Sequence, residues 1–178
     1  MRKFISFFHV LFLLPNFVSA EVVEIYSLNH IDDRRGYCID IKGHKFKAKV
    51  QKGLQAHTCY SYQGEITVDQ GFDSHKLIDN QFNISYFNVC IEIKLLNAST
   101  SLQLKKCQND QLQKFKRDNE GRIQPVSGMN LCLTIAKGQP KRGGGGSPVH
   151  LIRKLSLKDC SVTLKSFQRW GKRNIRAP

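Results

Sequence analysis

The feature that most constrains this chain is a three-part motif that occurs three times in the same order. The first part is a cysteine followed by apolar and polar residues in alternation, at 38–41, 90–93 and 132–135. The second part ends in another cysteine, at 54–59, 102–107 and 155–160. The third part places an aromatic residue two positions after a glutamine, at 70–72, 113–115 and 168–170. The repeat predicts three copies of one unit that fold together, because a unit of this size cannot bury an apolar face alone.

The pattern inside each unit indicates β-structure. Apolar and polar residues alternate over short runs that are separated by Gly, Asn, Asp and Ser, and no helical period is sustained. Three hairpin-rich units can close into a barrel, which leaves no strand edge exposed. With 178 residues, 40% of them hydrophobic, the chain is long enough for a single domain with a substantial core. The sequence therefore predicts an all-β fold.

The first twenty residues have the pattern of a secretory signal peptide. Arg2 and Lys3 precede an apolar run at 4–14, and small residues follow at 18–20. The apolar run is too short to span a bilayer, which takes about 20 residues, and no later segment is more apolar. We therefore expect a secreted, extracellular protein without a transmembrane segment, in which residues 21–178 form one domain.

All six cysteines lie after residue 20, where an exported chain meets an oxidising compartment. Their even number favours disulfide bonds, and no Cys-x-x-Cys or His-x-x-x-His spacing supports a metal site. We predict no metal and no cofactor. The sequons at Asn83 and Asn97 are candidate N-glycosylation sites and make the chain a candidate glycoprotein.

The order of these parts resembles the ricin B-type β-trefoil lectins, from Val23 to the end of the chain. The resemblance implies three four-stranded repeats, at about 23–82, 83–125 and 126–178, around a pseudo-threefold axis. One shallow sugar pocket is then available per repeat. The resemblance also implies a disulfide bond within each repeat, namely Cys38–Cys59, Cys90–Cys107 and Cys132–Cys160.

The resemblance further implies a sugar site. In these lectins an acid two positions after the first cysteine accepts hydrogen bonds from sugar hydroxyls. A glutamine and an aromatic platform lie on the following strand, and an Asn-Gln pair opens the third part. A carboxylate suits the hydroxyl edge of a pyranose, and a ring suits its C–H face. In the first repeat these positions are Asp40, Gln55, His57, Asp69 and Gln70.

Two of these positions depart from the family pattern. His57 stands where the stacking Trp or Tyr is usual, and Asp69 replaces Asn, so it accepts but does not donate. Tyr60 and Tyr62 are candidates for the missing aromatic face. The other repeats carry less suitable residues, namely Glu92, Lys105 and Leu112 in the second, and Thr134, Ser156 and Lys158 in the third. We therefore expect binding of galactose or N-acetylgalactosamine glycans on cell surfaces, mainly through the first repeat.

The charge of the chain supports an alternative function. The formal net charge is +14. If Lys45, Lys47 and Lys49 lie on a strand, their side chains point the same way and form a row of positive charge. Such a row attracts sulfated glycans or other acidic polysaccharides, and less plausibly nucleic acid outside cells. Binding of a protein receptor through the same basic face is a further alternative.

The sequence does not favour an enzyme. It contains no Gly-x-Ser-x-Gly, no His-Glu-x-x-His and no phosphate-binding loop, since the glycine tract at 143–146 is not followed by Gly-Lys-Ser or Gly-Lys-Thr. We assign no catalytic residue. We expect the glycine tract to be a surface hairpin inserted in the third repeat.

Overall fold

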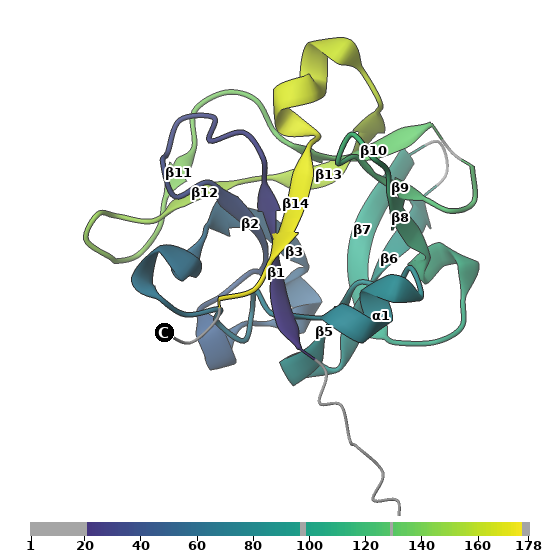
Figure 1. The fold of residues 1–178 in the computed structure, drawn as a ribbon, viewed down its shortest axis with the longest axis horizontal. Helices are drawn as coiled ribbons and strands as arrows, with labels where there is room; N and C mark the ends of the chain where they lie inside the picture. Colours follow the sequence, from purple (N-terminus) through teal and green to yellow (C-terminus); the bar gives the residue numbers. More distant parts are fainter. Residues whose placement is uncertain (1–20, 97–98, 129, 176–178) are drawn as a thin grey trace, which may run out of the picture.

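The computed structural model describes residues 21–96, 99–128 and 130–175, which form an all-β fold with few short helices (Figure 1). The expected signal peptide at 1–20 and the sequon residue Asn97 lie outside the described residues. No helix in the described part of the chain is long and apolar enough to cross a membrane.

The strands are short and follow one another along the whole described chain. In the first half they are β1 (Val22–Ser27), β2 (Tyr37–Ile41), β3 (Leu54–Thr58), β4 (Phe72–Asp73), β5 (Asn83–Ile84), β6 (Val89–Leu96) and β7 (Ser99–Lys106). In the second half they are β8 (Phe115–Arg117), β9 (Ile123–Pro125), β10 (Leu131–Ile135), β11 (Lys141–Arg142), β12 (Leu151–Arg153), β13 (Leu155–Asp159) and β14 (Trp170–Arg173). In the described residues α1 (Ser74–Ile78) is the α-helix, and the 3-10 helices are Lys45–Lys47, Val50–Lys52, Tyr60–Gln63, Ser85–Phe87, Gln111–Gln113 and Val162–Phe167.

Three antiparallel hairpins carry the cysteine motifs. They pair β2 with β3, β6 with β7 and β10 with β13, and in each the first cysteine lies on the leading strand. The disulfide bonds are Cys38–Cys59, Cys90–Cys107 and Cys132–Cys160, as the resemblance implies. Each bond clips a hairpin across 17 to 28 residues, and a loop of that length contributes about 3 kcal/mol of stability.

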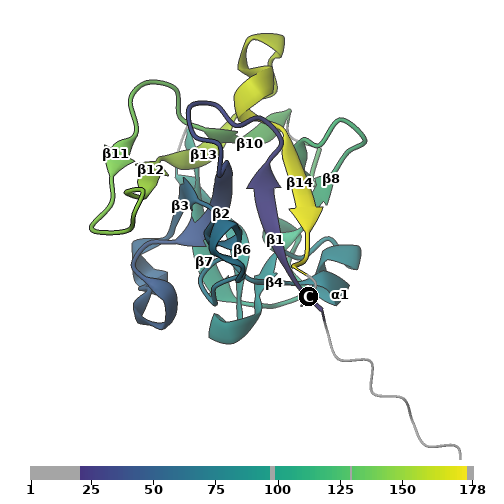
Figure 2. The same ribbon diagram turned by 60° about the vertical axis from the view of Figure 1, so that its left-hand side comes forward.

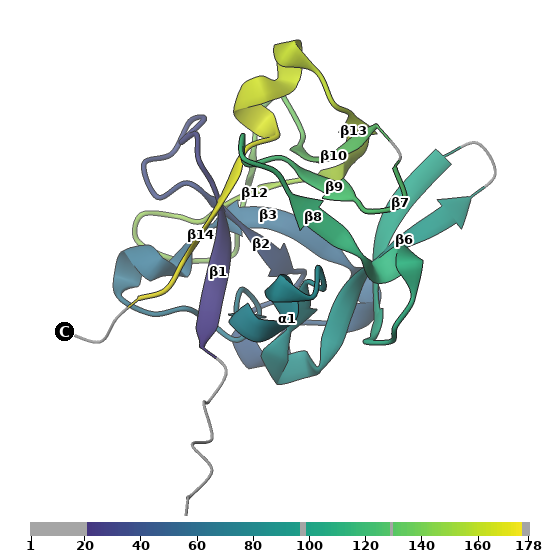
Figure 3. The same ribbon diagram turned by 45° about the vertical axis from the view of Figure 1, so that its right-hand side comes forward.

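A second set of short strands links the hairpins. β1 pairs with both β14 and β4, β4 pairs with β5, and β8 pairs with β9. A bridge between Gln81 and Lys114 connects the β5 and β8 segments, and Trp170 donates from its backbone N–H to Gly121 beside β9, at 2.7 Å. Figure 3 shows β8 and β9 beside β6 and β7, with β14 against β1. The hydrogen bonds thus lead around the molecule and back to β1.

The aromatic residues of the third motif part lie in the core. Trp170 and Phe72 are fully buried and Phe115 is nearly so. Phe82 bridges the two phenylalanines through edge contacts at 6.2 and 6.1 Å between ring centroids. The indole N–H of Trp170 donates to the carbonyl of Leu133 at 2.9 Å. These rings therefore belong to the core, and the one polar ring atom among them has a hydrogen-bond acceptor.

The inserted hairpin of the third repeat does not stand free. Strands β11 and β12 extend the first hairpin, so that the sheet order is β11-β12-β3-β2, and Ile152 pairs with His57. Figure 2 shows β11 and β12 alongside β3 and β2. Residues of the third repeat therefore form part of the surroundings of the candidate sugar site in the first.

The expected row of Lys45, Lys47 and Lys49 on a strand is wrong. Residues Lys45–Lys47 form a 3-10 turn, and the loop closes on itself through Lys42, which donates to the Gly53 carbonyl at 3.0 Å and accepts from the Lys49 N–H at 2.9 Å. A loop of this curvature cannot keep alternate side chains on one face as a strand does.

The sequon residue Asn83 is buried. Its side chain is 6% exposed, and the amide nitrogen, which would carry a glycan, donates to the Val89 carbonyl at 3.2 Å and contacts the Cys107 sulfur at 3.0 Å. This placement argues against a glycan at Asn83 in the folded chain.

Candidate functional site

Asp40 lies at the centre of the candidate site. The register of β2 and β3 sets it opposite Gln55, whose amide donates to Asp40 Oδ1 at 2.7 Å. The amide of Gln70 donates to the other carboxyl oxygen, Oδ2, at 3.1 Å. The carboxyl group is only 1% exposed. Both of its oxygens are therefore held by side-chain amides from the protein.

The surroundings of Asp40 favour its protonated form. Burial raises the pKa of Asp40 well above its ordinary value, and the negative charge of Asp69 raises it further. The hydrogen bonds from Gln55 and Gln70 act in the opposite direction but are the smaller effect. A buried acid held in this way is part of the fold and positions its hydrogen-bond donors, Gln55 and Gln70.

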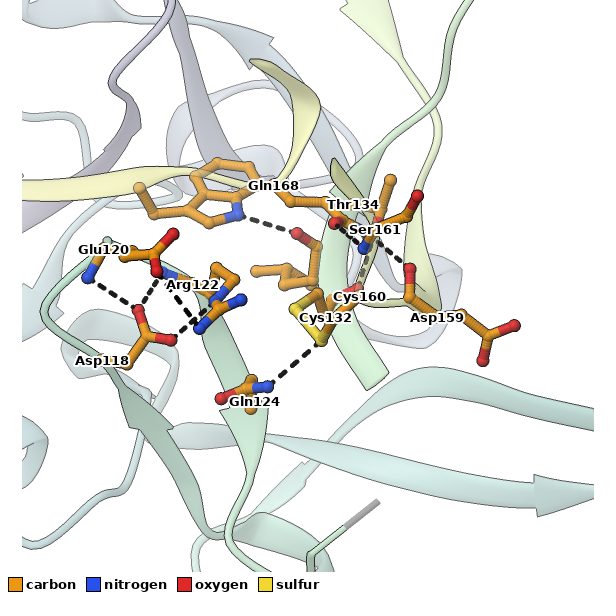
Figure 4. The surroundings of a disulfide bond; sticks show 12 residues. Asp118, Glu120, Arg122, Gln124, Cys132, Thr134, Asp159, Cys160, Ser161 and Gln168 are labelled. Atoms are coloured by element: carbon orange, nitrogen blue, oxygen red, sulfur yellow. Dashed lines mark hydrogen bonds and ion pairs between the residues drawn. A yellow bond between two sulfur atoms is a disulfide. The ribbon is translucent and has the colours of Figure 1, made fainter. Parts of the chain in front are cut away.

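A similar hydrogen bond from a glutamine side chain occurs in the other two hairpins. In the second, Glu92 accepts from Gln103 and Gln113, each at 2.7 Å. In the third, the hydroxyl of Thr134 accepts from Gln168 at 2.9 Å (Figure 4). In each repeat, the glutamine of the third motif part thus bonds a side chain on the hairpin strand that bears the first cysteine.

The side-chain oxygen of each of these glutamines also accepts a hydrogen bond from an equivalent position in its repeat. The side-chain oxygen of Gln70 accepts from the N–H of Tyr60, and those of Gln113 and Gln168 accept from Gln108 and Ser161. Each of these three donors directly follows the second cysteine of its repeat. The recurrence explains the glutamine of the motif structurally, because a buried amide must find partners at both ends.

Asp69 holds the neighbouring loop. It is fully buried, its Oδ2 accepts from the backbone N–H of Lys45, and its carbonyl accepts from the N–H of Ile41 at 3.1 Å. No hydrogen-bond partner of Asp69 Oδ1 is found in the described part of the chain. Asp69 therefore fixes the 3-10 turn at Lys45–Lys47 beside the first hairpin.

Three rings gather at the end of the first hairpin. The centroid of His57 lies 5.0 Å from that of Tyr60 and 4.8 Å from that of His150, and Tyr60 and His150 are also 4.8 Å apart. All three side chains are buried. His57 is 5% exposed within this ring cluster, so little of its ring is available as the stacking platform that the resemblance implies.

A cavity of about 540 Å³ lies against this ring cluster. Its walls come from the loop after β2, from β3 and its following turn, and from the inserted hairpin: Gly43, His44, Lys45, His57, Tyr60, Gln63, 143–146, His150 and Ile152. A volume of this size is in the range of small-molecule sites. We call this space the ring-cluster cavity.

The protonation of His57 follows from its contacts. Burial lowers its pKa to about 4, so the ring is neutral at neutral pH. Its Nδ1 lies 2.8 Å from the Thr58 carbonyl oxygen, which can only accept, so Nδ1 carries the proton. The other nitrogen, Nε2, is then a hydrogen-bond acceptor, on a residue that lines the cavity.

The inserted hairpin is anchored firmly over the first. The guanidinium of Arg35 donates to the carbonyls of Pro148 and Val149, at 3.0 and 2.7 Å, and also pairs with Asp33 at 2.7 Å. Gly146 has a φ of +94°, and a Cβ atom there would lie 2.6 Å from the His150 ring. Only glycine therefore allows the hairpin to approach this closely.

The structure brings together most of the residues that the sequence selects. His57, Tyr60 and Lys45 line the ring-cluster cavity, and behind it Gln70 bonds both Asp40 and the N–H of Tyr60. Tyr62 is exposed and is not among the lining residues.

Sequence reasoning missed His44, His150 and the glycine tract as cavity walls. His150 is 92 residues from Thr58, the side chain it contacts at 3.1 Å, and nothing in the repeat pattern links the two. The sequence feature that could have indicated these walls is the glycine tract at 143–146, because glycine permits close approach of two backbones.

A small cavity lies beside the 3-10 helix Val162–Phe167 of the third repeat. Its volume is about 110 Å³, and the position that it shares with the ring-cluster cavity is the one after the second cysteine, where Ser161 stands for Tyr60. That volume is well below the roughly 300 Å³ of a typical ligand site.

The potential metal ligands that cluster in the described residues are Glu24, Cys38 and Cys59, but both sulfurs are in the disulfide bond.

No protein-family model matches the chain, and no curated protein matches it either.

Proposed function

We propose that this chain is a secreted, disulfide-bonded β-trefoil lectin of the ricin B type, which binds carbohydrate through its first repeat. The order of elements supports the trefoil. β1–β4 and β5–β8 make two four-stranded units, and β9, β10, β13 and β14 make a third, with β11 and β12 as an insertion. The three disulfide-clipped hairpins occupy the same place in each unit.

The observation that carries the proposal is the ring-cluster cavity at the first repeat. His57, one of the positions that the resemblance assigns to a sugar, lines it together with Tyr60, its volume is large enough for a monosaccharide, and its walls combine rings with polar groups. Lysines stand at the positions equivalent to His57 in the other two repeats, Lys105 and Lys158, and this difference supports a single working site.

The wall residues favour recognition of sugar hydroxyls. His57 Nε2 accepts a hydrogen bond, and His44 is exposed with its Nδ1 3.3 Å from the Tyr60 hydroxyl. Buried amides and carboxyls behind the wall, above all Gln70 and Asp40, hold these groups in place. Galactose and N-acetylgalactosamine are the first ligands to test, and their apolar face would lie against the ring cluster.

His44 offers a test because it is exposed and lines the cavity, and its side-chain hydrogen bond among the described residues is the 3.3 Å contact with the Tyr60 hydroxyl. We expect His44→Ala to weaken binding of galactosides to the disulfide-bonded protein about fivefold in calorimetric titration, since one hydrogen bond to a ligand contributes about 1 kcal/mol. His75→Ala is the matched control, because His75 is an exposed histidine on α1, away from the cavity lining. Equal binding by the two variants, or no binding by the wild type, would overturn the proposal.

The alternative of polyanion binding along Lys45, Lys47 and Lys49 is less well supported. Lys45 pairs with Glu65, and Lys47 lies over the ring of Phe46, 5.7 Å from its centroid. These contacts and the curved loop leave no continuous positive row on this segment.

A further inference from the structure

A second cavity, of about 500 Å³, lies next to the ring-cluster cavity and is lined by cationic side chains. Lys42 comes from the loop after β2, and Gln55 from β3. The remaining cations come from the third repeat, namely Lys137, Lys141, Arg153 and Lys154, and no carboxylate lines the cavity. We call this space the lysine cavity.

Arg153 builds the wall of the lysine cavity. It is buried, and its guanidinium donates to the carbonyls of Ala136 and Gly138, at 2.9 and 2.6 Å. Its charge is matched by Asp32 at 2.6 Å. Because the two carbonyls flank Lys137, this buried pair fixes the loop that carries Lys137. The guanidinium of Arg153 is therefore engaged in contacts within the protein and is not assigned to a ligand.

The four lysines of this cavity are different. All four are exposed, and among the residues that the structure describes none forms an ion pair with a carboxylate. Lys137 has one other contact, with the ring of Phe167 at 5.8 Å from its centroid. Like charges gathered around one hollow repel one another, and an anion relieves that repulsion. The chemistry that fits the lysine cavity is a carboxylate or a sulfate group.

The two cavities share a wall. Ile152 lines both, and Gln55 and His57, which line one each, lie two residues apart on β3 and so point to the same side of the strand. Gln55 uses its amide nitrogen on Asp40, which leaves its side-chain oxygen for the lysine cavity. A sugar in one cavity is therefore a direct neighbour of a group in the other.

From this juxtaposition we propose that the ligand is an acidic oligosaccharide that spans both cavities. A neutral sugar unit occupies the ring-cluster cavity, and the carboxylate or sulfate ester of the adjacent unit occupies the lysine cavity. This inference rests on the proposed function, because it assumes a sugar in the first cavity. It assigns the acid group to Lys42, Lys137, Lys141 and Lys154.

The test compares three galacto-oligosaccharides of equal length by calorimetry: a neutral one, one with a uronic acid unit and one with a sulfate ester. The full disulfide-bonded protein is measured beside the double variant K141Q/K154Q. The control, K106Q/K116Q, removes two exposed lysines from β7 and β8, which Figure 1 places on the opposite side of the molecule from β11 and β12.

We expect at least one acidic oligosaccharide to bind the wild type about tenfold more tightly than the neutral one, which is the effect of two charge contacts at a wet surface. K141Q/K154Q should lose this preference and keep neutral binding unchanged. K106Q/K116Q should retain the preference. Comparison of the uronate with the sulfate ester then identifies the acid group.

Other results would overturn the inference in distinguishable ways. Neutral binding without any acidic preference would remove the lysine cavity from recognition and leave the proposed function intact. An equal loss in both double variants would show that the preference comes from overall charge. If inorganic sulfate alone binds as tightly as the sulfated oligosaccharide, the sugar contributes nothing, and the proposed function fails together with the spanning ligand.

Discussion

The side-chain amide of Gln70 donates to the carboxyl group of Asp40 across 3.1 Å, and its oxygen accepts from the N–H of Tyr60. One glutamine thus joins the acid on β2 to the turn that carries a ring of the cavity wall. Because Asp40 is itself almost fully buried, it acts on a ligand through these neighbours. Substitutions at Asp40 should therefore separate the stability of the fold from binding.

Asp40→Ala should destabilise the protein by about 2 to 4 kcal/mol, because it leaves the buried amides of Gln55 and Gln70 without an acceptor. Asp40→Asn should be mild. The side chain of Gln55 can turn over and accept from the new amide, since its oxygen has no partner among the described residues. Denaturant unfolding monitored by Trp170 fluorescence measures both. A loss on Asp40→Asn equal to that on Asp40→Ala would contradict this account.

The titration of His57 should lower the free energy of unfolding in mild acid. Its pKa is lowered in the folded protein to about 4, from 6.5. The unfolded chain therefore binds the proton more tightly, and between these two values stability decreases as pH falls, by up to about 3 kcal/mol. The lowered pKa of His150 acts in the same direction. The raised pKa of Asp40 acts oppositely, because it makes the fold more stable as pH falls.

Unfolding of the wild type and of His57→Gln at neutral pH and near pH 4.5 measures this effect. The wild type should lose more stability than the variant over this range. Parallel pH profiles for the two proteins would show that His57 titrates normally in the fold, which the structure does not allow.

Gly146→Ala should weaken sugar binding, whereas Gly144→Ala should not. A Cβ at Gly146 would press on the His150 ring, and the φ of +94° is unfavourable for alanine, at a cost of about 1 kcal/mol. A Cβ at Gly144 meets nothing within 4 Å. Galactoside titration of both variants, with the chemical shifts of His150 as a second readout, tests the role of the hairpin. Equal affinities would place the ligand away from this wall.

Arg35→Lys should loosen the inserted hairpin without unfolding the protein. A lysine cannot reproduce the fork that reaches Asp33 and the carbonyls of Pro148 and Val149 together. We expect faster amide hydrogen exchange at 143–151 and unchanged exchange in β6 and β7. If exchange speeds up equally in both regions, Arg35 stabilises the whole domain and does not anchor the hairpin specifically.

The repeated local pattern of the sequence was sufficient for the all-β fold, and the family resemblance that the pattern carries implied the three disulfide pairings that the structure contains. It also selected Asp40, Gln55 and Gln70, which do meet in space. It could not reveal that Asp40 and Gln70 are buried behind the cavity, because an acid that is hydrogen-bonded within the fold and an acid that binds a ligand occur at the same spacing.

The remaining features depend on contacts between distant segments. The pairing of β12 with β3 brings His150 and Ile152 to the first repeat from about a hundred residues away. The lysine cavity arises in the same way, from Lys42 on one side and the third repeat on the other. The curvature of the loop at 42–53 overrode the alternation that predicted a strand at Lys45, Lys47 and Lys49.

The most direct test of the central claim is a glycan-binding profile of the disulfide-bonded protein, at low and at physiological salt, with His44→Ala and His75→Ala alongside. We predict binding to neutral galactosides that persists in salt, weakens in His44→Ala and is unchanged in His75→Ala. Binding to no neutral glycan at either salt concentration, or neutral binding that is indifferent to His44, would contradict a sugar site in the ring-cluster cavity.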